Sequence, residues 1–312
     1  MVQNYVTKST QTEKISLSYS TLSIIFHTFA NMIAPLILLN AGIARLNADW
    51  NWKNVRSPFA RIYYVVEGRA QLLLPDRKLE LTPGKLYLIP PFTTHHDVCN
   101  GRFVHYYLHF YEQKDFTRQG IFDEWEVPYE MDADPNTLAM IKHICELKPN
   151  LQLPASDPET YDNHARLMEI LKEEAEQPLA ERMEIQGILQ ILLSQFLRQA
   201  RKRLMANDYR IQQALTFIHQ HLGDKMNLDT LAETTCVSKD HLIRLFKQTM
   251  GETPANYITG RKMEQAELLL TTTSIPVKNI STELGYDDTS YFIRVFRKHS
   301  SMSPQEYRNT RQ

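Results

Sequence analysis

This 312-residue sequence has almost no net charge and few cysteines. Its 35 Lys and Arg residues nearly balance 36 Asp and Glu residues, and the formal net charge is −1. Many proteins that bind duplex DNA are far more basic, so bulk electrostatics gives such a partner almost no support. The three cysteines, Cys99, Cys145 and Cys236, are odd in number and lack metal-like spacing. This usage argues against a disulfide framework or a cysteine-based metal site, and it suits reduced thiols in a cytoplasmic protein.

Long apolar runs are also missing. Residues 22–39 form the most apolar stretch, but His27, Asn31 and Pro35 interrupt it. We therefore expect a pair of core strands there rather than a membrane span. The chain does not open with a charged segment, an apolar core and a cleavage site, so we expect neither a secretion signal nor a membrane partner.

The last hundred residues contain one motif twice. HLIRLFKQ, at residues 241–248, returns as YFIRVFRK at residues 291–298, and each copy is followed by a Pro and, three residues later, a Tyr. Residues 243–257 map onto residues 293–307 by one constant shift of 50 positions. Duplicated helical hairpins of this kind allow one chain to contact two neighbouring stretches of DNA.

Each copy has the pattern of a helix, a short turn and a second helix. Ser238 is placed to cap the second helix of the first copy, and Gly251 to end it. The first helices of the two copies align by a shift of 49 rather than 50, so the second turn is one residue longer, and Gly285 suits it because glycine adopts positive φ freely. Residues 254–270 between the copies predict a helix roughly 25 Å long, comparable with a DNA turn of about 34 Å.

The polar face of each second helix carries the DNA-binding candidates. Short polar side chains early in such a helix approach base edges, and an Arg one turn later pairs with guanine or phosphate. The candidates are Lys239, Asp240, Ile243, Arg244 and Lys247 in the first copy, and Thr289, Ser290, Tyr291, Arg294 and Arg297 in the second. A solvated helix face is the alternative for one such helix, but two copies in register favour DNA.

The last hundred residues resemble a known family. LAETTCVSKDHLIRLFKQTMGETPANYITGRKMEQAELLL, followed by IPVKNISTELGYDDTSYFIRVFRKHSSMSPQEYR, resembles the DNA-binding domain of AraC/XylS-family bacterial transcription regulators. The shared motifs are A-x-L-L in the linker helix, G-Y/F-x-D-x-S-Y-F, and the final S-P-x-x-Y-R. The resemblance implies a double helix-turn-helix that binds double-stranded promoter half-sites, a homodimer, and contact with RNA polymerase.

Some positions depart from the family pattern. Ser301 stands where Gly is usual and Ser281 where Ala is usual, so we expect looser packing of the second hairpin. Asp240 and Ile243 offer little to base edges, so we expect the second copy to make more direct base contacts, while the first relies on Arg244 and phosphate anchoring. From Asn207 onward 13 Lys and Arg face 12 Asp and Glu. We expect one domain to show a modest salt dependence and to need a partner for useful affinity.

Residues 59–110 predict a different kind of domain. Short β-branched and aromatic runs end at Gly68, Pro75-Asp76, Pro83-Gly84 and Asn100-Gly101, which indicates a small β-sandwich or barrel. The run VEG…LTPGKLYLIPPFTTHH resembles the cupin-like sensor domain that precedes this DNA-binding domain in the family.

A metal-dependent cupin enzyme is the rival interpretation. The positions of the usual His, His and Glu ligands hold Arg56, Pro58 and Ile62, and Phe92 and Cys99 stand where Gly and Asn are expected. None of the first three binds a metal, so we expect no metal, no cofactor and no catalytic residue.

Alternation on one strand gives the effector-binding candidates. His105, Tyr107 and His109 alternate with apolar residues and therefore share one face of a strand. Such a face can stack on and hydrogen-bond a sugar or another polar small molecule. In sugar-sensing relatives the matching strand contributes an aromatic residue and a His, so His105 and Tyr107 lead a set that also contains Arg61, His95 and His109. The alternative interpretation is that these five residues are ordinary interior residues of the domain and bind no ligand.

Three helices are expected after Pro135, Pro158 and Pro178. The third carries a broad apolar stripe of Ile185, Ile188, Leu189, Leu192, Leu193 and Phe196. Packing on its own domain explains part of this stripe, and the family precedent for dimers favours a partner helix. The basic run at residues 198–203 is expected to end this helix in solvent, before a hinge at residues 206–208.

The sequence therefore predicts an α+β multidomain protein. Residues 1–126 are assigned to a cupin-like β-barrel or sandwich that binds an effector, residues 127–206 to a helical linker and dimerisation region, and residues 207–312 to an all-α domain with two helix-turn-helix motifs. The expected function is sequence-specific transcription regulation, as an effector-responsive activator of a metabolic operon, with carbohydrate as one candidate effector. The alternatives are a DNA-binding regulator without an effector and a metal-dependent cupin enzyme.

Overall fold

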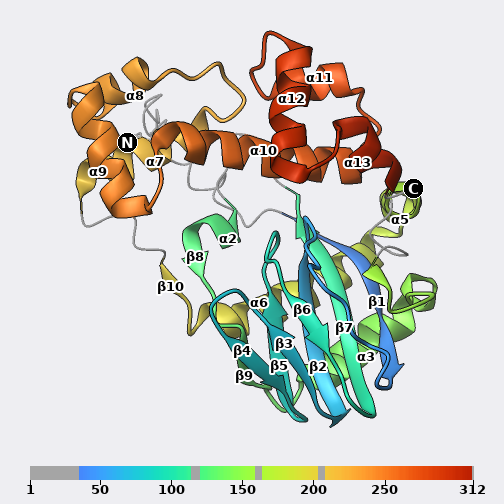
Figure 1. The fold of residues 1–312 in the computed structure, drawn as a ribbon. Helices are drawn as coiled ribbons and strands as arrows, with labels where there is room; N and C mark the ends of the chain where they lie inside the picture. Colours follow the sequence, from blue (N-terminus) through green and yellow to red (C-terminus); the bar gives the residue numbers. More distant parts are fainter. Residues whose placement is uncertain (1–34, 114–119, 159–163, 203–207, 311–312) are drawn as a thin grey trace, which may run out of the picture. The chain divides into compact units, whose positions relative to one another are not determined.

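Two antiparallel β-sheets face each other in a computed structural model that describes residues 35–113, 120–158, 164–202 and 208–310. The five-stranded sheet has the order β1–β7–β2–β5–β9, and the three-stranded sheet the order β4–β3–β6 (Figure 1). In chain order the strands are β1 (Leu36–Leu46), β2 (Ala60–Gly68), β3 (Ala70–Leu73), β4 (Lys78–Leu81), β5 (Lys85–Ile89), β6 (His96–Val98), β7 (Phe103–Glu112) and β9 (Glu130–Asp132). The described strands form a sandwich and no closed barrel. Of the expected strand pair at residues 22–39, the part before residue 35 lies outside the described residues.

The five-stranded sheet separates two apolar cores, because neighbouring residues of a strand point to opposite faces. Leu108 and Phe110 of β7 belong to the core that also contains residues of the flanking helices. Phe103 and Tyr107 of the same strand belong to a second core, together with Leu72 of the three-stranded sheet. Burying a large apolar side chain of this kind stabilises the fold by about 1.5–3 kcal/mol.

Helices cover the outer face of the five-stranded sheet. Three of them follow Pro135, Pro158 and Pro178, where the sequence predicted helices. They are α3 (Thr137–Leu147), α5 (His164–Glu176) and α6 (Leu179–Leu197), with a single 3₁₀ turn, η1 (Pro149–Leu151), after α3 and a short α2 (Ile121–Glu124) before it. On α6 the Gln186 amide donates to the backbone oxygen of Leu36 at 2.9 Å and accepts from its N–H at 3.1 Å. This pairing holds α6 against edge strand β1. No helix in the described ranges is long and apolar enough to cross a membrane.

The apolar stripe of α6 is not the dimer interface that the sequence suggested. Ile185, Leu189, Leu192, Leu193 and Phe196 are at most 2% exposed and Ile188 packs beside them, all in the core beneath the chain's own sheet. The pattern gave the buried face of the helix correctly, but it could not distinguish a sheet of the same chain from a partner chain.

The basic run after α6 also differs from expectation. The helix ends at Leu197, and β10 (Arg201–Lys202) pairs with β8 (Trp125–Glu126) as a two-residue antiparallel ribbon. Strand pairing therefore replaces the solvated helix end expected there. The expected hinge falls largely outside the described residues.

The C-terminal region consists of helices. They are α7 (Tyr209–Gln220), α8 (Leu228–Thr234), α9 (Lys239–Met250), α10 (Pro254–Thr272), α11 (Val277–Glu283), α12 (Thr289–Ser300) and α13 (Pro304–Thr310). The Ser238 side chain accepts from the N–H of His241, and Gly251 ends α9 at a φ of 80°, as predicted. The turn from α8 to α9 spans residues 235–238 and the turn from α11 to α12 spans residues 284–288, so the second turn is one residue longer, as predicted.

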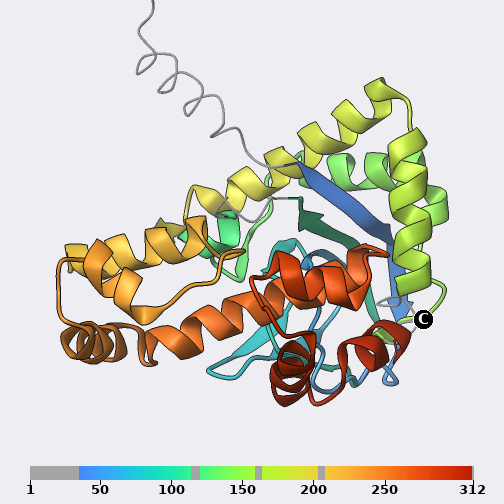
Figure 2. The same cartoon turned by 90° about the horizontal axis from the view of Figure 1, so that it is seen from above.

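Helix α10 runs between two groups of helices (Figures 1 and 2), and each group has its own apolar core. Its Ile258 belongs to the first core, with residues of α7, α8 and α9. Its Met263, Ala266 and Leu270 belong to the second core, with residues of α11, α12 and α13. The two helix-turn-helix units are thus packed on opposite halves of one helix.

The family departures in the second unit have visible consequences. Ser301 ends α12 at a φ of 66°, in the left-handed region where a side chain is strained and glycine is not. The buried Ser281 hydroxyl has no hydrogen-bond partner in the described part of the chain. Both features are unfavourable relative to the usual Gly and Ala, because each adds strain or an unpaired polar group.

Candidate functional site

The candidate residues of α9 lie on one solvent-exposed face. Lys239, Asp240, Arg244 and Lys247 are exposed, while Ile243 is half-buried. The Lys239 ammonium lies 3.1 Å from an Asp229 carboxylate oxygen, and an Arg244 N–H lies 3.1 Å from Nδ1 of His241. These contacts hold two cations near the start and middle of the helix.

The matching face of α12 is built differently. Asp288 caps the helix by accepting from the N–H of Ser290 at 2.8 Å. The ring of Tyr291 is half exposed, and the Arg294 guanidinium lies over it at 5.6 Å from its centroid. Such an arrangement stabilises a cation and orients it. Arg297, one turn later, donates to Glu306 at 3.1 Å and is therefore already paired with a carboxylate.

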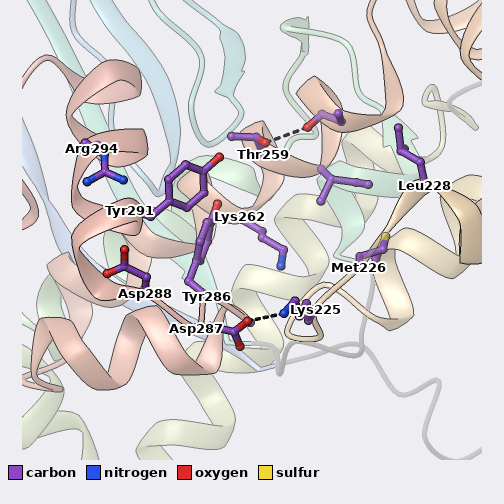
Figure 3. Close-up of a pocket in the computed structure, with 13 residues that line it drawn as sticks. Lys225, Met226, Leu228, Thr259, Lys262, Tyr286, Asp287, Asp288, Tyr291 and Arg294 are labelled. Carbon is purple, nitrogen blue, oxygen red and sulfur yellow. Dashed lines mark hydrogen bonds and ion pairs between the residues drawn. The ribbon is translucent and has the colours of Figure 1, made fainter.

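A cleft of about 520 Å³ lies between the two helix-turn-helix units (Figure 3). Tyr291 and Arg294 of α12 line it together with Lys225 and Met226, which precede α8. Across the cleft, the Lys225 ammonium forms an ion pair with Asp287, and both side chains are exposed. Candidate residues of α12 thus border a cleft that is lined by both cations and carboxylates and that also includes part of the first unit.

Sequence reasoning missed Lys225 and Lys262 as members of this region. Lys262 lies on α10 at four-residue spacing from Ile258 and Ala266, which are both buried, and it is itself 5% exposed. A Lys on the apolar stripe of a helix is the signal that could have identified it. Burial lowers the pKa of its ammonium to about 8, so it carries its charge at neutral pH.

The five effector candidates are all buried between the two sheets. Arg61, His95, His105, Tyr107 and His109 are at most 3% exposed. The strand register places Arg61 opposite His109, Tyr63 opposite Tyr107 and Val65 opposite His105, so the predicted shared face exists. His95 lies outside these two strands and forms an isolated β-bridge with Val55.

Aromatic rings surround this polar cluster. The His105 ring lies 4.8 Å from the ring of Phe103, 4.8 Å from that of Tyr63 and 5.6 Å from that of Trp50. Tyr107 is oriented by its hydroxyl, which accepts from the N–H of Leu153 at 2.7 Å. Aromatic rings therefore enclose the candidate site, which is buried rather than open to solvent.

Several buried polar atoms in the cluster have no hydrogen-bond partner in the described ranges. They are Nδ1 of His105, Nε2 of His95, Oδ1 of Asp97 and Nε1 of Trp52. Native proteins leave few such atoms without a hydrogen bond. Two of them, Nε2 of His95 and Oδ1 of Asp97, lie 3.8 Å from each other. The two histidines were predicted from the sequence as candidate residues, whereas Asp97 and Trp52 were not.

Burial sets the charge of this cluster. It lowers the pKa of both His95 and His105 to about 3, so both rings are neutral at pH 7. Burial raises the pKa of Asp97 to about 7, although the Arg61 guanidinium acts in the opposite direction. At pH 7 the cluster therefore contains the permanent cation of Arg61, the neutral rings of His95 and His105, and the Asp97 carboxyl with its pKa of about 7.

A second buried carboxylate lies on α10. Glu267 is 1% exposed and accepts hydrogen bonds from Arg56 and, at 3.4 Å, from the Tyr307 hydroxyl. Burial tends to raise its pKa, but His299 and Arg56 more than offset this, so the pKa lies below its usual value. Arg56 adjoins Val55, the residue that bridges to His95. A short stretch of chain thus joins the polar cluster to α10.

Comparison with known proteins places these features in context. Residues 231–310 match the helix-turn-helix domain family. The arabinose operon regulatory protein of Escherichia coli (strain K12) is 35% identical over 102 residues, or 32% of this chain and 35% of that protein. The regulatory protein SoxS of the same strain is 32% identical over 105 residues, or 34% of this chain and 98% of SoxS. The uncharacterized HTH-type transcriptional regulator YisR of Bacillus subtilis (strain 168) is 24% identical over 259 residues, or 82% of this chain and 87% of YisR.

The duplicated helical unit and its matches define a helix-turn-helix protein of the DNA-binding class. The chain belongs to the AraC family of transcription regulators, as the resemblance in its sequence implied. It spans about a third of the length of the arabinose operon regulators that it matches.

Proposed function

We propose that this protein regulates transcription by binding two successive major-groove segments of promoter DNA through α9 and α12. The observation that carries the proposal is the pair of exposed, cation-bearing helix faces packed on opposite halves of α10. Arg294 is the foremost base-reading candidate, because it is exposed and is oriented by Tyr291. On α9, Asp240 and the half-buried Ile243 offer less to bases, so Arg244 and Lys247 serve mainly as phosphate contacts.

The DNA proposal is tested by replacing Arg294 with Ala. The operator is first selected from random duplexes with the full chain, and binding is then followed by fluorescence anisotropy. An arginine that pairs with a guanine contributes about 1–3 kcal/mol of discrimination, which corresponds to a roughly 5- to 150-fold change in Kd. Arg77→Ala, on an exposed loop before β4, is the matched control and should leave Kd unchanged. Equal binding by Arg294→Ala and the parent chain would remove Arg294 from the site.

We further propose a homodimer formed through the outer face of α6. Leu179, Met183 and Ile191 are 63%, 66% and 49% exposed and follow four-residue steps along the helix, with Gly187 between them. Exposed apolar side chains in one row are typical of a contact surface. Two domains on one DNA would also compensate for the near-neutral charge of each.

We propose that a polar small molecule, with a sugar as first candidate, binds in the cluster between the sheets and controls the regulator. Support comes from buried side-chain atoms of His95, Asp97 and His105 that form no hydrogen bond within the described residues, and that could bind a ligand with several hydroxyl groups. A ligand there would reach α10 through Val55, Arg56 and Glu267 and so alter the DNA-binding domain. Recruitment of RNA polymerase, and hence activation, is proposed from family membership alone.

The effector proposal is tested by thermal unfolding of the full chain with a panel of neutral mono- and disaccharides. A sugar at 100 times its Kd should stabilise the chain by about 2.7 kcal/mol and raise the melting temperature by several degrees. His105→Phe keeps the ring packing but removes Nδ1, so it should abolish the rise. His143→Phe, on the exposed face of α3, is the control. A rise that survives His105→Phe, or no rise with any sugar, would contradict the proposal.

A further inference from the structure

The two helix-turn-helix units touch each other directly, besides sharing α10. Lys262 lies between Ile258, which packs in the first core, and Met263, which packs in the second. It is therefore the point on α10 where one unit ends and the other begins. Its side chain is 5% exposed and points into the cleft region (Figure 3).

The ammonium of Lys262 binds one backbone carbonyl from each unit. It donates to the oxygen of Asp224, in the loop after α7, at 2.9 Å. It also donates to the oxygen of Leu284, at the end of α11, at 2.6 Å. An ammonium has three donors and no acceptor, so carbonyl oxygens are suitable partners. The same group lies 5.3 Å from the Tyr286 ring centroid.

Two more contacts bring the same two segments together. Gly285 adopts a φ of 72°, and a Cβ atom there would lie 2.5 Å from the carbonyl carbon and oxygen of Asp224. No real Cβ makes such a contact with backbone, so only glycine permits this approach. Next to these residues, Lys225 pairs with Asp287 across the cleft. The loop after α7 and the turn before α12 are thus in contact at three successive points.

We propose that Lys262 is a positioning residue that ties the two units together and thereby fixes the number of base pairs between the two DNA segments they contact. The inference rests on the proposed DNA-binding function. Two hydrogen bonds from one buried ammonium oppose rocking of one unit relative to the other, and they add to the contacts of Gly285 and Lys225. Each added base pair moves a recognised segment by about 3.4 Å and rotates it by roughly 35°. A tied pair of units cannot follow this change.

The experiment measures spacing tolerance. Lys262→Met removes the donors but keeps an unbranched side chain that suits the buried site. Anisotropy titrations compare the selected operator with duplexes in which one base pair is inserted or deleted between the two segments. For the parent chain we expect the altered spacing to weaken binding at least tenfold. For Lys262→Met we expect weaker binding to the native spacing and a spacing penalty below about threefold.

Lys278→Met, on the exposed face of α11, is the matched control and should retain the full spacing penalty. Circular dichroism and melting curves establish that each variant is folded. A folded Lys262→Met protein that retains the tenfold penalty would overturn the proposal.

Hydrogen exchange of the free protein tests the tie without DNA. In Lys262→Met, amides at residues 222–226 and 284–287 should lose protection together, while α9 and α12 keep theirs. Unchanged protection of both segments would overturn the proposal even if DNA binding were intact. If the parent chain binds no specific DNA, the proposed function fails, and the exchange result still decides whether Lys262 ties the units.

Discussion

Among individual residues, the polar side chains between the sheets are the most informative. Sequence alternation correctly placed His105, Tyr107 and His109 on one face, because strand geometry determines that face locally. It did not reveal that the face is completely covered. The cover comes from Trp50 and from the bridge between Val55 and His95, which are contacts between distant parts of the chain. Burial and missing partners therefore had to come from the structure.

Asp97 should make the stability of the chain depend on pH. Its pKa is raised from 3.8 to about 7, so between these values the folded chain retains a proton that the unfolded chain releases. Folding then becomes less favourable as pH rises through this window. Asp97→Asn removes the effect, so its stability relative to the parent chain should increase from pH 4 to pH 8, by an amount on the order of a few kcal/mol.

Urea unfolding at pH 4, 6 and 8 measures this dependence. Asp132→Asn, at the exposed end of β9, is the control. Its free energy of unfolding should differ from that of the parent chain by the same amount at each pH. A constant difference for Asp97→Asn across the three pH values would show that Asp97 is ionised in the folded chain.

At the level of elements, caps and turns were predictable and packing partners were not. Ser238, Gly251 and the longer second turn followed from local chemistry and from the 49-residue shift, and all three were confirmed. Phe92 stands where glycine is usual, and its φ of 59° shows that the backbone does adopt the left-handed conformation there. The partner of the α6 stripe was predicted wrongly, because helical periodicity shows which face is buried but not what covers it.

The outer face of α6 offers a direct test of the proposed dimer. Met183→Glu places a charge in the exposed row beside Leu179 and Ile191 without touching the core. If this row is the interface, analytical ultracentrifugation should show a shift from dimer toward monomer. The variant should still unfold cooperatively on heating, which shows that the monomer is folded. Glu184→Gln, next to it and paired with His143, is the control. A dimer that persists unchanged in Met183→Glu would place the interface elsewhere.

At the scale of the whole molecule, the two helix-turn-helix units and one buried polar cluster are joined by short structural paths. One path runs from His95 through Val55 and Arg56 to Glu267 of α10. The other is the Lys262 tie between the units. The family and both domain types were predictable from motifs. These paths were not, since each depends on a single side chain that meets distant backbone or a distant carboxylate.

The central claim is that α9 and α12 enter two successive major grooves of one DNA site. Methylation interference on the selected operator tests it most directly, because guanine N7 lies in the major groove. We expect, for each bound domain, two groups of interfering guanines on one face of the duplex, with centres about 10–10.5 base pairs apart. In the Arg294→Ala variant the group contacted by α12 should weaken selectively. A single group of interfering guanines per domain, or interference that Arg294→Ala leaves unchanged in both groups, would contradict the account.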